Sequence, residues 1–247
     1  MTATRRATDT LAILVVLVVF WQILHQIAGS TALPAPWTTL AYLAQFAASE
    51  RFAASAATTM LELAFALLLA YGIGLAIGVW MGAHRLSGAV GEPILVALYS
   101  VPKITLYPVV LLIFGLGISG KVAFGALHGT LPVALLTMGA IRAIPHAYLR
   151  AARSLQLSPW QTIATVLLPA ALPEVFTGLR IGFTVTLLGV LLGEMFASKA
   201  GLGSMIMTDM SLAQSEDMVT VAIILFVFAA CANALLLWIE HRLHRRV

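Results

Sequence analysis

The sequence predicts an all-α membrane protein with about six transmembrane helices, and composition and block length are the two observations behind this prediction. Of the 247 residues, 61% are hydrophobic and only 10% are charged, whereas soluble domains have about 45–50% apolar and about 25% charged residues. The apolar residues form long blocks, and the mean hydropathy is +0.99. A chain of this composition needs lipid as its solvent, and at this length it is expected to form one domain.

The apolar blocks are long enough to cross a bilayer, because a spanning helix needs roughly 17–25 residues. The candidate spans are 11–28, 55–82, 92–114, 121–141, 171–197 and 218–239. The third span contains Pro102 and Pro108 and is the weakest candidate. The first span follows Arg5 and Arg6 as in a signal peptide, but its length and the lack of a clean cleavage site predict a retained helix.

Basic residues indicate the orientation of these spans through the positive-inside rule. With a cytoplasmic N-terminus, ten arginines lie inside: Arg5, Arg6, Arg85, Arg142, Arg150, Arg153, Arg180, Arg242, Arg245 and Arg246. Three basic residues lie outside, namely Arg51, Lys121 and Lys199. Both termini are therefore expected in the cytoplasm. On the outer side, prolines end the first span, and the segment from Trp37 to Phe46 predicts a short interfacial helix.

The charge and cysteine content exclude two classes of partner. The net charge is +4, but the arginines gather at the ends of apolar blocks and no interleaved aromatic and basic surface is present, so no nucleic-acid partner is expected. The single cysteine, Cys231, lies in an apolar run and is expected to be a buried small residue. It leaves no disulfide and no thiolate metal site.

The inner loop 142–170 is predicted to fold into two short helices that project from the membrane. Pro145 can begin a helix that runs to about Gln156. Pro169 is expected to end the second helix, because proline lacks the backbone N–H that a helix interior needs.

A capping box predicts where the second helix begins. Ser158 is the N-cap residue, Pro159 occupies the first helical position, and Gln161 follows three residues after the serine. In this arrangement the two side chains satisfy each other's backbone N–H groups.

This loop resembles the EAA motif of binding-protein-dependent ABC permeases, Glu-Ala-Ala-x3-Gly-x9-Ile-x-Leu-Pro. Ala151 and Ala152 occupy the alanine positions, and residues 166–169 occupy Ile-x-Leu-Pro. The chain also resembles the subfamily that imports nitrate, sulfonates and taurine. The matching segments are Pro102-Lys103 through Pro108, Phe114-Gly115, residues 168–173, Gly178-Leu-Arg180, Gly193-Glu-Met195 and Gly201-Leu-Gly203. The similarity covers roughly residues 55–240.

The resemblance implies the fold of a type I ABC importer permease and a place in a bacterial inner membrane. It implies an N-terminal helix with an external segment over 1–54, a permease core over 55–240 with the coupling loop 142–170, and a basic cytoplasmic tail over 241–247. It also implies the partners: two cytoplasmic ATPase subunits that bind ATP and Mg²⁺, a second permease copy, and an extracytoplasmic solute-binding protein. The chain itself is then not an enzyme and holds no cofactor.

The resemblance also assigns an ATPase-coupling surface, with two departures from the motif. The surface comprises Arg150, Ala151, Ala152, Arg153, Gln156, Ser158, Pro159, Trp160 and Pro169. Arg150 stands at the glutamate position, which reverses a charge, and a compensating acid on the ATPase is the simplest explanation. Gln156 stands at the glycine position, where a left-handed turn costs a residue with a Cβ roughly 1–2 kcal/mol, unless the turn has a different geometry.

Ionisable residues within the spans are candidate functional groups, because a charge in the bilayer costs several kcal/mol. These residues are Glu62, Lys103, His128 and Glu194. Lys103 is the best candidate contact for an anionic cargo, with Tyr99 and Tyr107 about one turn to either side. The alternatives are internal pairing for Glu62 and Lys103, hydrogen-bonded packing for His128, and attachment of a neighbouring helix for Glu194. No metal site is predicted, since no second ligand has suitable spacing with His128.

Glycines at four-residue spacing predict close helix packing within the membrane. They are Gly74, Gly78 and Gly82 in one span, and Gly178 and Gly182 in another. The pattern Gly-x-Gly-x-x-Gly over 115–120 is not a nucleotide site, because it lies between two spans with no strand before it. ATP hydrolysis therefore belongs to a partner.

Two other classes of protein remain as alternatives. An ion-gradient-driven secondary transporter would have similar spans, although no convincing inverted repeat is present. An intramembrane enzyme ranks last, because no pair of nucleophile and base has suitable spacing, and no catalytic residue is assigned. The cargo stays open: a sulfonate, taurine or nitrate follows from the resemblance, and an aromatic acid or a vitamin precursor is not excluded.

Overall fold

The computed structural model describes residues 3–244, and its described residues form helices without any strand. In chain order the helices are α1 (Ala3–Ala28), α2 (Pro36–Ala47), α3 (Glu50–Ala83), α4 (Arg85–Ser100), η1 (Lys103–Leu106), α5 (Tyr107–Phe114), α6 (Ile118–Arg142), α7 (His146–Ser154), α8 (Pro159–Thr162), η2 (Ile163–Leu167), α9 (Leu168–Ala197), α10 (Leu202–Ser211) and α11 (Ser215–His244).

The predicted spans are confirmed, with one of them broken. Within the described residues, α1, α3, α6, α11 and the continuous stretch α8–η2–α9 are each long and apolar enough to cross a membrane. The helices α4 and η1–α5 pass the same test only together, and they are bent by 87°. The break falls at Val101 and Pro102, where the backbone leaves the helical region and the proline cannot donate a hydrogen bond. The predicted all-α membrane fold is therefore confirmed.

Helices α3, α6 and α9 form the central unit, and small residues let them approach closely. A Cβ added at Gly74 would lie 2.8 Å from Val133 Cβ, and one added at Gly78 would lie 2.6 Å from Thr137 Cβ. Gly82 meets Ile141 in the same way, one turn further along α3. These contacts bring the backbones of α3 and α6 together along the predicted glycine face.

Helix α9 packs against α6 through glycines from both helices, and it reaches residues of α6 that also face α3. Gly178 faces Leu136, and a Cβ at Gly182 would lie 2.5 Å from Val133 Cγ2. On α6, a Cβ at Gly129 would lie 2.0 Å from the Thr186 hydroxyl. Since α3 and α9 both pack against α6, this helix is the most buried of the spans.

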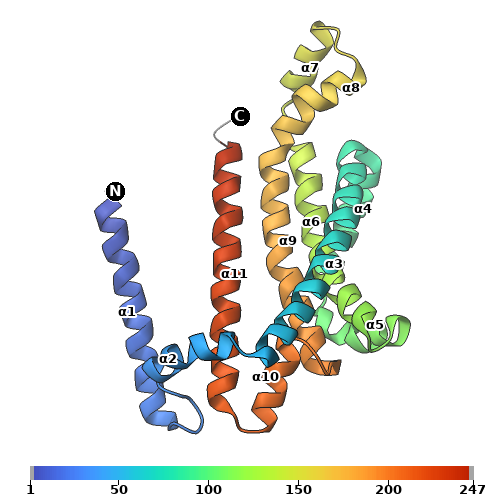
Figure 1. Cartoon of the computed structure of the whole chain (residues 1–247). Helices are drawn as coiled ribbons and strands as arrows, with labels where there is room; N and C mark the ends of the chain where they lie inside the picture. Colours follow the sequence, from blue (N-terminus) through green and yellow to red (C-terminus); the bar gives the residue numbers. More distant parts are fainter. Residues whose placement is uncertain (1–2, 245–247) are drawn as a thin grey trace.

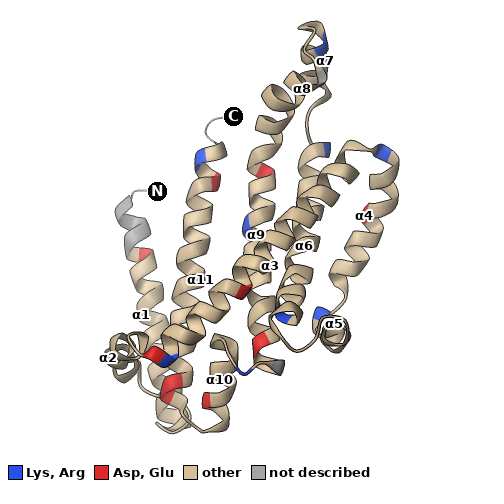
Figure 2. Ribbon diagram, turned by 45° about the vertical axis from the view of Figure 1, so that its right-hand side comes forward, with Lys and Arg blue, Asp and Glu red and all other residues tan. Residues whose placement is uncertain are grey.

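The two ends of the bundle differ in what they carry (Figure 1). Helices α7 and α8 project beyond the bundle at the end where α1 begins and α11 finishes, and this end is called the α7–α8 end. Helices α2 and α10 lie at the opposite end, called the α10 end. Charged residues are sparse along the spans and concentrate toward the two ends (Figure 2).

Helix α1 stands apart from the bundle. It contacts α2, and Trp21 Nε1 donates a hydrogen bond to the carbonyl of Pro34, in the segment before α2. None of the side chains in its spanning window is buried. The predicted interfacial helix 37–46 is present as α2 and packs Phe46 against α10 and α11.

Two local expectations were wrong. Pro169 does not end a helix: it lies in the first turn of α9, directly after the π-helical turn η2, and the helix continues through it. The wider hydrogen-bonding pattern of a π turn accommodates a residue without an N–H. Cys231 is exposed on α11 rather than buried. Of the predicted basic tail, Arg245 and Arg246 lie outside the described residues.

Candidate functional site

The α7–α8 protrusion, residues 143–162, is built as two helices around a tight turn. Helix α7 follows Pro145 and ends at Ser154, close to the predicted bounds. The turn places Gln156 at φ +52°, in the left-handed region. Gln156 N donates to the Arg153 carbonyl, and Leu157 N donates to the Ala152 carbonyl. Gln156 therefore adopts the conformation that the glycine of the motif favours, and it bears the cost of a Cβ there.

The predicted capping box is formed at the start of α8. Gln161 N donates to Ser158 Oγ over 3.2 Å, and Ser158 N donates to Gln161 Oε1 over 2.9 Å. The helix begins at Pro159, as expected. These two hydrogen bonds fix the direction in which α8 leaves the turn.

The surface of the protrusion combines positive charge with apolar side chains. Arg150 and Arg153 are exposed on α7, whereas Ala152 is buried beneath them and Ala151 is exposed. Leu155 is 71% exposed and Trp160 is 76% exposed. Exposed large apolar residues at a water-facing tip are typical of a protein interface.

Two of the predicted intramembrane charges belong to a buried cluster near the α10 end. Glu62 on α3 forms an ion pair with Lys121 on α6, and both side chains are almost completely buried. Lys121 Nζ also donates to Ser198 Oγ over 2.9 Å. Lys121, counted above among the basic residues of the outer side, points into the bundle and is covered by the segment that follows α9.

Glu194 binds the start of α10. Its Oε1 accepts a hydrogen bond from Thr59 Oγ1, and its Oε2 accepts one from Gly203 N, each over 2.7 Å. The Glu62 carboxyl lies close enough to interact with Glu194 electrostatically. Of the two roles left open by the sequence, this geometry corresponds to attachment of a neighbouring helix.

The other predicted pathway residues come from α4, η1, α5 and α6. Tyr107 is buried, donates to the Gly193 carbonyl over 2.6 Å and packs on Phe124, which in turn contacts His128 edge-on at 4.5 Å. His128 Nδ1 lies 2.9 Å from the Phe124 carbonyl oxygen. Among the described residues, no group of three or more potential ligands surrounds a metal position.

Lys103 lies at the bend between α4 and α5, close enough to His128 to interact with it electrostatically. Its Nζ donates to the Tyr99 carbonyl over 3.1 Å and sits 4.4 Å from the centre of the Tyr99 ring. No described carboxylate lies within ion-pair distance of Lys103. The broken span thus carries a cation whose nearest described polar partners are neutral.

The α10 end has its own polar surface. Arg51 forms ion pairs with Asp209 of α10 and Asp217 of α11, and Tyr42 donates to Asp217 over 3.0 Å. Burial raises the pKa of the Asp209 carboxyl, while the Arg51 guanidinium acts in the opposite direction.

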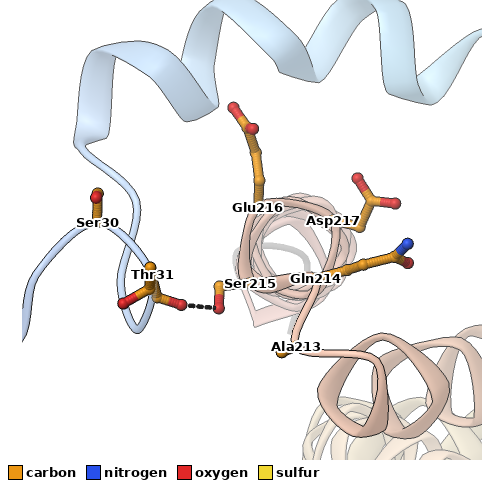
Figure 3. Close-up of a pocket in the computed structure, with 7 residues that line it drawn as sticks. All are labelled: Ser30, Thr31, Ala213, Gln214, Ser215, Glu216 and Asp217. Atoms are coloured by element: carbon orange, nitrogen blue, oxygen red, sulfur yellow. Dashed lines mark hydrogen bonds between the residues drawn. The ribbon is translucent and has the colours of Figure 1, made fainter.

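An open crevice of about 330 Å³ lies at the first turn of α11 (Figure 3). Ser215 donates a hydrogen bond across it to the Thr31 carbonyl. Glu216 and Asp217 project from the same turn.

Sequence reasoning missed the pairs that join distant helices. Arg180 of α9 donates to Glu240 of α11 over 2.6 Å, and Arg142 of α6 donates to Glu92 of α4 over the same distance. From the sequence, Arg180 counts among the arginines of the cytoplasmic side, and no partner is predicted for it. The signal that could have found its partner is the presence of Glu240 near the same end of an adjacent span.

The comparisons with known proteins agree with this arrangement. The family model "Binding-protein-dependent transport system inner membrane component" matches residues 70–247. A probable ABC transporter permease of Haemophilus influenzae is 30% identical over 239 residues, which cover 96% of this chain and 97% of that protein. The taurine transport system permease of Escherichia coli is 31% identical over 203 residues, which cover 80% of this chain and 73% of the relative.

Solved structures show the same fold. The inward-facing MetNI methionine ABC transporter matches with a TM-score of 0.65 and 21% identity, over 75% of this chain and 93% of that one. An amino acid ABC transporter matches with a TM-score of 0.63 and 20% identity, over 83% and 97%. Together with the family match, these similarities show that the chain belongs to the inner membrane permease components of binding-protein-dependent ABC importers.

Proposed function

We propose that this chain forms the translocation pathway of an ABC importer as one of two identical permease subunits. The α7–α8 end faces the cytoplasm and the α10 end faces outward, in agreement with the distribution of arginines. The observation that carries the proposal is the protrusion: two short helices, the second with a capping box, extend beyond the bundle (Figure 1) and expose Trp160 and Leu155. ATP and Mg²⁺ belong to two cytoplasmic ATPase subunits, and cargo arrives on an extracytoplasmic binding protein.

The chemistry of the protrusion specifies its partner surface. Arg150 and Arg153 are exposed on α7, and no acidic residue lies on that helix. The complementary groove on the ATPase is therefore acidic at the rim and apolar where it receives Trp160 and Leu155. Because Arg150 replaces the glutamate of the motif, the ATPase surface that contacts it has to carry an acidic residue.

Copurification of the tagged chain with ATPase candidates from the same membranes tests the partnership. The wild-type chain should recover an ATPase, and crosslinks should map to 146–162. Replacing Arg150 and Arg153 together with Glu should lower recovery at least about tenfold, since like charges placed opposite each other across an interface cost several kcal/mol and each ~1.4 kcal/mol is about tenfold in affinity. Arg85→Glu is the matched control, because Arg85 is exposed at the start of α4, outside the protrusion. Equal recovery of both variants would reject the proposed docking surface.

We infer a small anion as cargo, of the kind named in the relatives: taurine, aliphatic sulfonates or nitrate. Lys103 is the supporting residue, because it lies at the bend of the broken span without a described carboxylate partner. A cation held by neutral groups attracts an anion transiently, as a transport pathway requires. Tyr99 borders the same position.

Uptake by liposomes that contain the complex tests both the energy source and Lys103. Import that requires internal ATP supports the ABC mechanism, whereas import driven by an ion gradient alone would favour a secondary transporter. Lys103→Met should reduce anion uptake about tenfold, and Lys103→Arg should retain most of it. Unchanged uptake in both variants would remove Lys103 from the pathway.

A further inference from the structure

Helix α10 (Leu202–Ser211) lies at one end of the bundle (Figure 1), and its two ends are attached to the core in different ways. Its first residues, Leu202 to Met205, are buried, whereas Met210 near its last turn is 55% exposed. One end of this helix is therefore enclosed by the core, and the other reaches the surface.

The enclosed end is attached through side chains of two core helices. Leu202 N donates to Thr59 Oγ1 over 2.8 Å, and Gly203 N donates to Glu194 Oε2 over 2.7 Å. The first backbone N–H groups of a helix have no partner within the helix. Here Thr59 of α3 and Glu194 of α9 supply those partners from the core.

The two side chains also bind each other, so the attachment is a single unit. Thr59 Oγ1 donates to Glu194 Oε1 over 2.7 Å while it accepts from Leu202 N. Gly201, at φ +103°, lets the backbone lie directly against the carboxyl: a Cβ there would be 2.2 Å from Glu194 Oε1. This unit of Thr59, Glu194 and residues 201–203 is called the α10 joint.

The exposed end of α10 is attached to α3 by an ion pair. Asp209 is fully buried and forms an ion pair with Arg51, which lies in the first turn of α3. Helix α10 is therefore fixed to α3 at both of its ends, and to α9 at the joint. A displacement of its exposed surface has to move α3 and α9 with it, unless the joint breaks.

We propose that the α10 joint transmits docking of the extracytoplasmic binding protein from the outer surface to α3 and α9, with Thr59 and Glu194 as its positioning residues. This inference rests on the proposed import function. The Thr59 hydroxyl is its central atom, because it is the one group bonded to both α10 and Glu194. Loss of that hydroxyl removes the bond from Leu202 N to α3 and the bond between Thr59 and Glu194, without removing any charge, and leaves the Gly203–Glu194 bond in place.

The complex reconstituted with its ATPase and cargo-loaded binding protein gives the test, with stimulation of ATP hydrolysis by the binding protein as the readout. Thr59→Val keeps the shape of the side chain and should reduce the stimulation at least fivefold. Thr59→Ser restores the hydroxyl and should restore the stimulation. Thr58→Val is the matched control, because the exposed Thr58 hydroxyl bonds only to the Ala54 carbonyl of its own helix.

The outcomes separate this inference from the proposed function. If the wild-type complex shows no stimulation and no ATP-dependent uptake, the import function itself is wrong. If the wild type is stimulated and Thr59→Val matches Thr58→Val, the joint does not transmit docking. If Thr59→Val fails to assemble, Glu194→Gln and Thr59→Ser are compared instead. Stimulation equal to that of the wild type in both variants overturns the inference. Loss of stimulation in Glu194→Gln alone supports it.

Discussion

Removing Lys121 should destabilise the bundle strongly, because it leaves the Glu62 carboxylate buried without its cation. Both side chains are almost completely shielded, and a second carboxyl, Glu194, lies beside Glu62. Breaking a buried ion pair on one side costs about 3–5 kcal/mol. For a chain of this size, 1 kcal/mol corresponds to roughly 2–4 °C in Tm, so Lys121→Met should lower Tm by on the order of 10 °C.

A double-mutant cycle separates the pair from general damage at the site. Glu62→Gln removes the charge that Lys121→Met leaves uncompensated, so the double variant should recover most of the lost stability. The coupling between the two positions is expected at about 2–3 kcal/mol. Thermal unfolding of the detergent-solubilised protein, followed by tryptophan fluorescence, gives the four Tm values that the cycle needs.

The exposed Lys199→Met is the matched control and should change Tm by less than about 2 °C, since isolated surface charges contribute little. If the effects of the two single variants simply add in the double variant, the cluster is not an energetically coupled ion pair. The same conclusion follows if Lys121→Met unfolds like Lys199→Met.

Three further changes test the packing and the protrusion. Gly78→Ala should cost about 1–3 kcal/mol, because its Cβ would overlap Thr137, whereas Gly72→Ala on the same helix meets nothing within 4 Å and should leave Tm unchanged or slightly raised. Ser158→Ala should cost about 1 kcal/mol of helix stability at the capping box and lower ATPase recovery in the copurification. Gln156→Gly should stabilise the protrusion by up to about 1 kcal/mol, measured as slower amide hydrogen exchange, because it relieves the left-handed conformation at φ +52°. Faster exchange would show that the glutamine side chain contributes more than the strain costs.

The spans could be predicted because they depend on properties that the local sequence carries. Hydropathy located six blocks, and the prolines at 102 and 108 marked the third as irregular, which the structure shows as an 87° bend. The capping box at Ser158 and Gln161 was equally local, since its two partners are three residues apart. Features of this kind need no knowledge of which helices become neighbours.

The buried cluster could not be predicted, because its members meet only through packing. Lys121 stands at the edge of an apolar block, and nothing in its neighbours distinguishes a flanking charge from a buried one. It is buried because α6 begins earlier, at Ile118, and because the segment after α9 covers it with Ser198. Glu62 in the middle of a span did indicate that a cation had to be close, but not which one.

The error at Pro169 has a mechanical consequence. Because η2 carries the helix past this proline, one continuous helical stretch runs from Trp160 in the protrusion to Phe196, next to the α10 joint. Two separate helices would have placed a flexible turn between the protrusion and the bundle. Instead, one continuous helical stretch contains both proposed functional positions. Trp160, on the surface proposed to bind the ATPase, lies near one end, and Glu194, which holds α10, lies near the other. A motion of the protrusion therefore reaches the opposite end of the bundle through α9, and the π turn and Pro173 are the places along that path where the regular helical hydrogen bonding is interrupted.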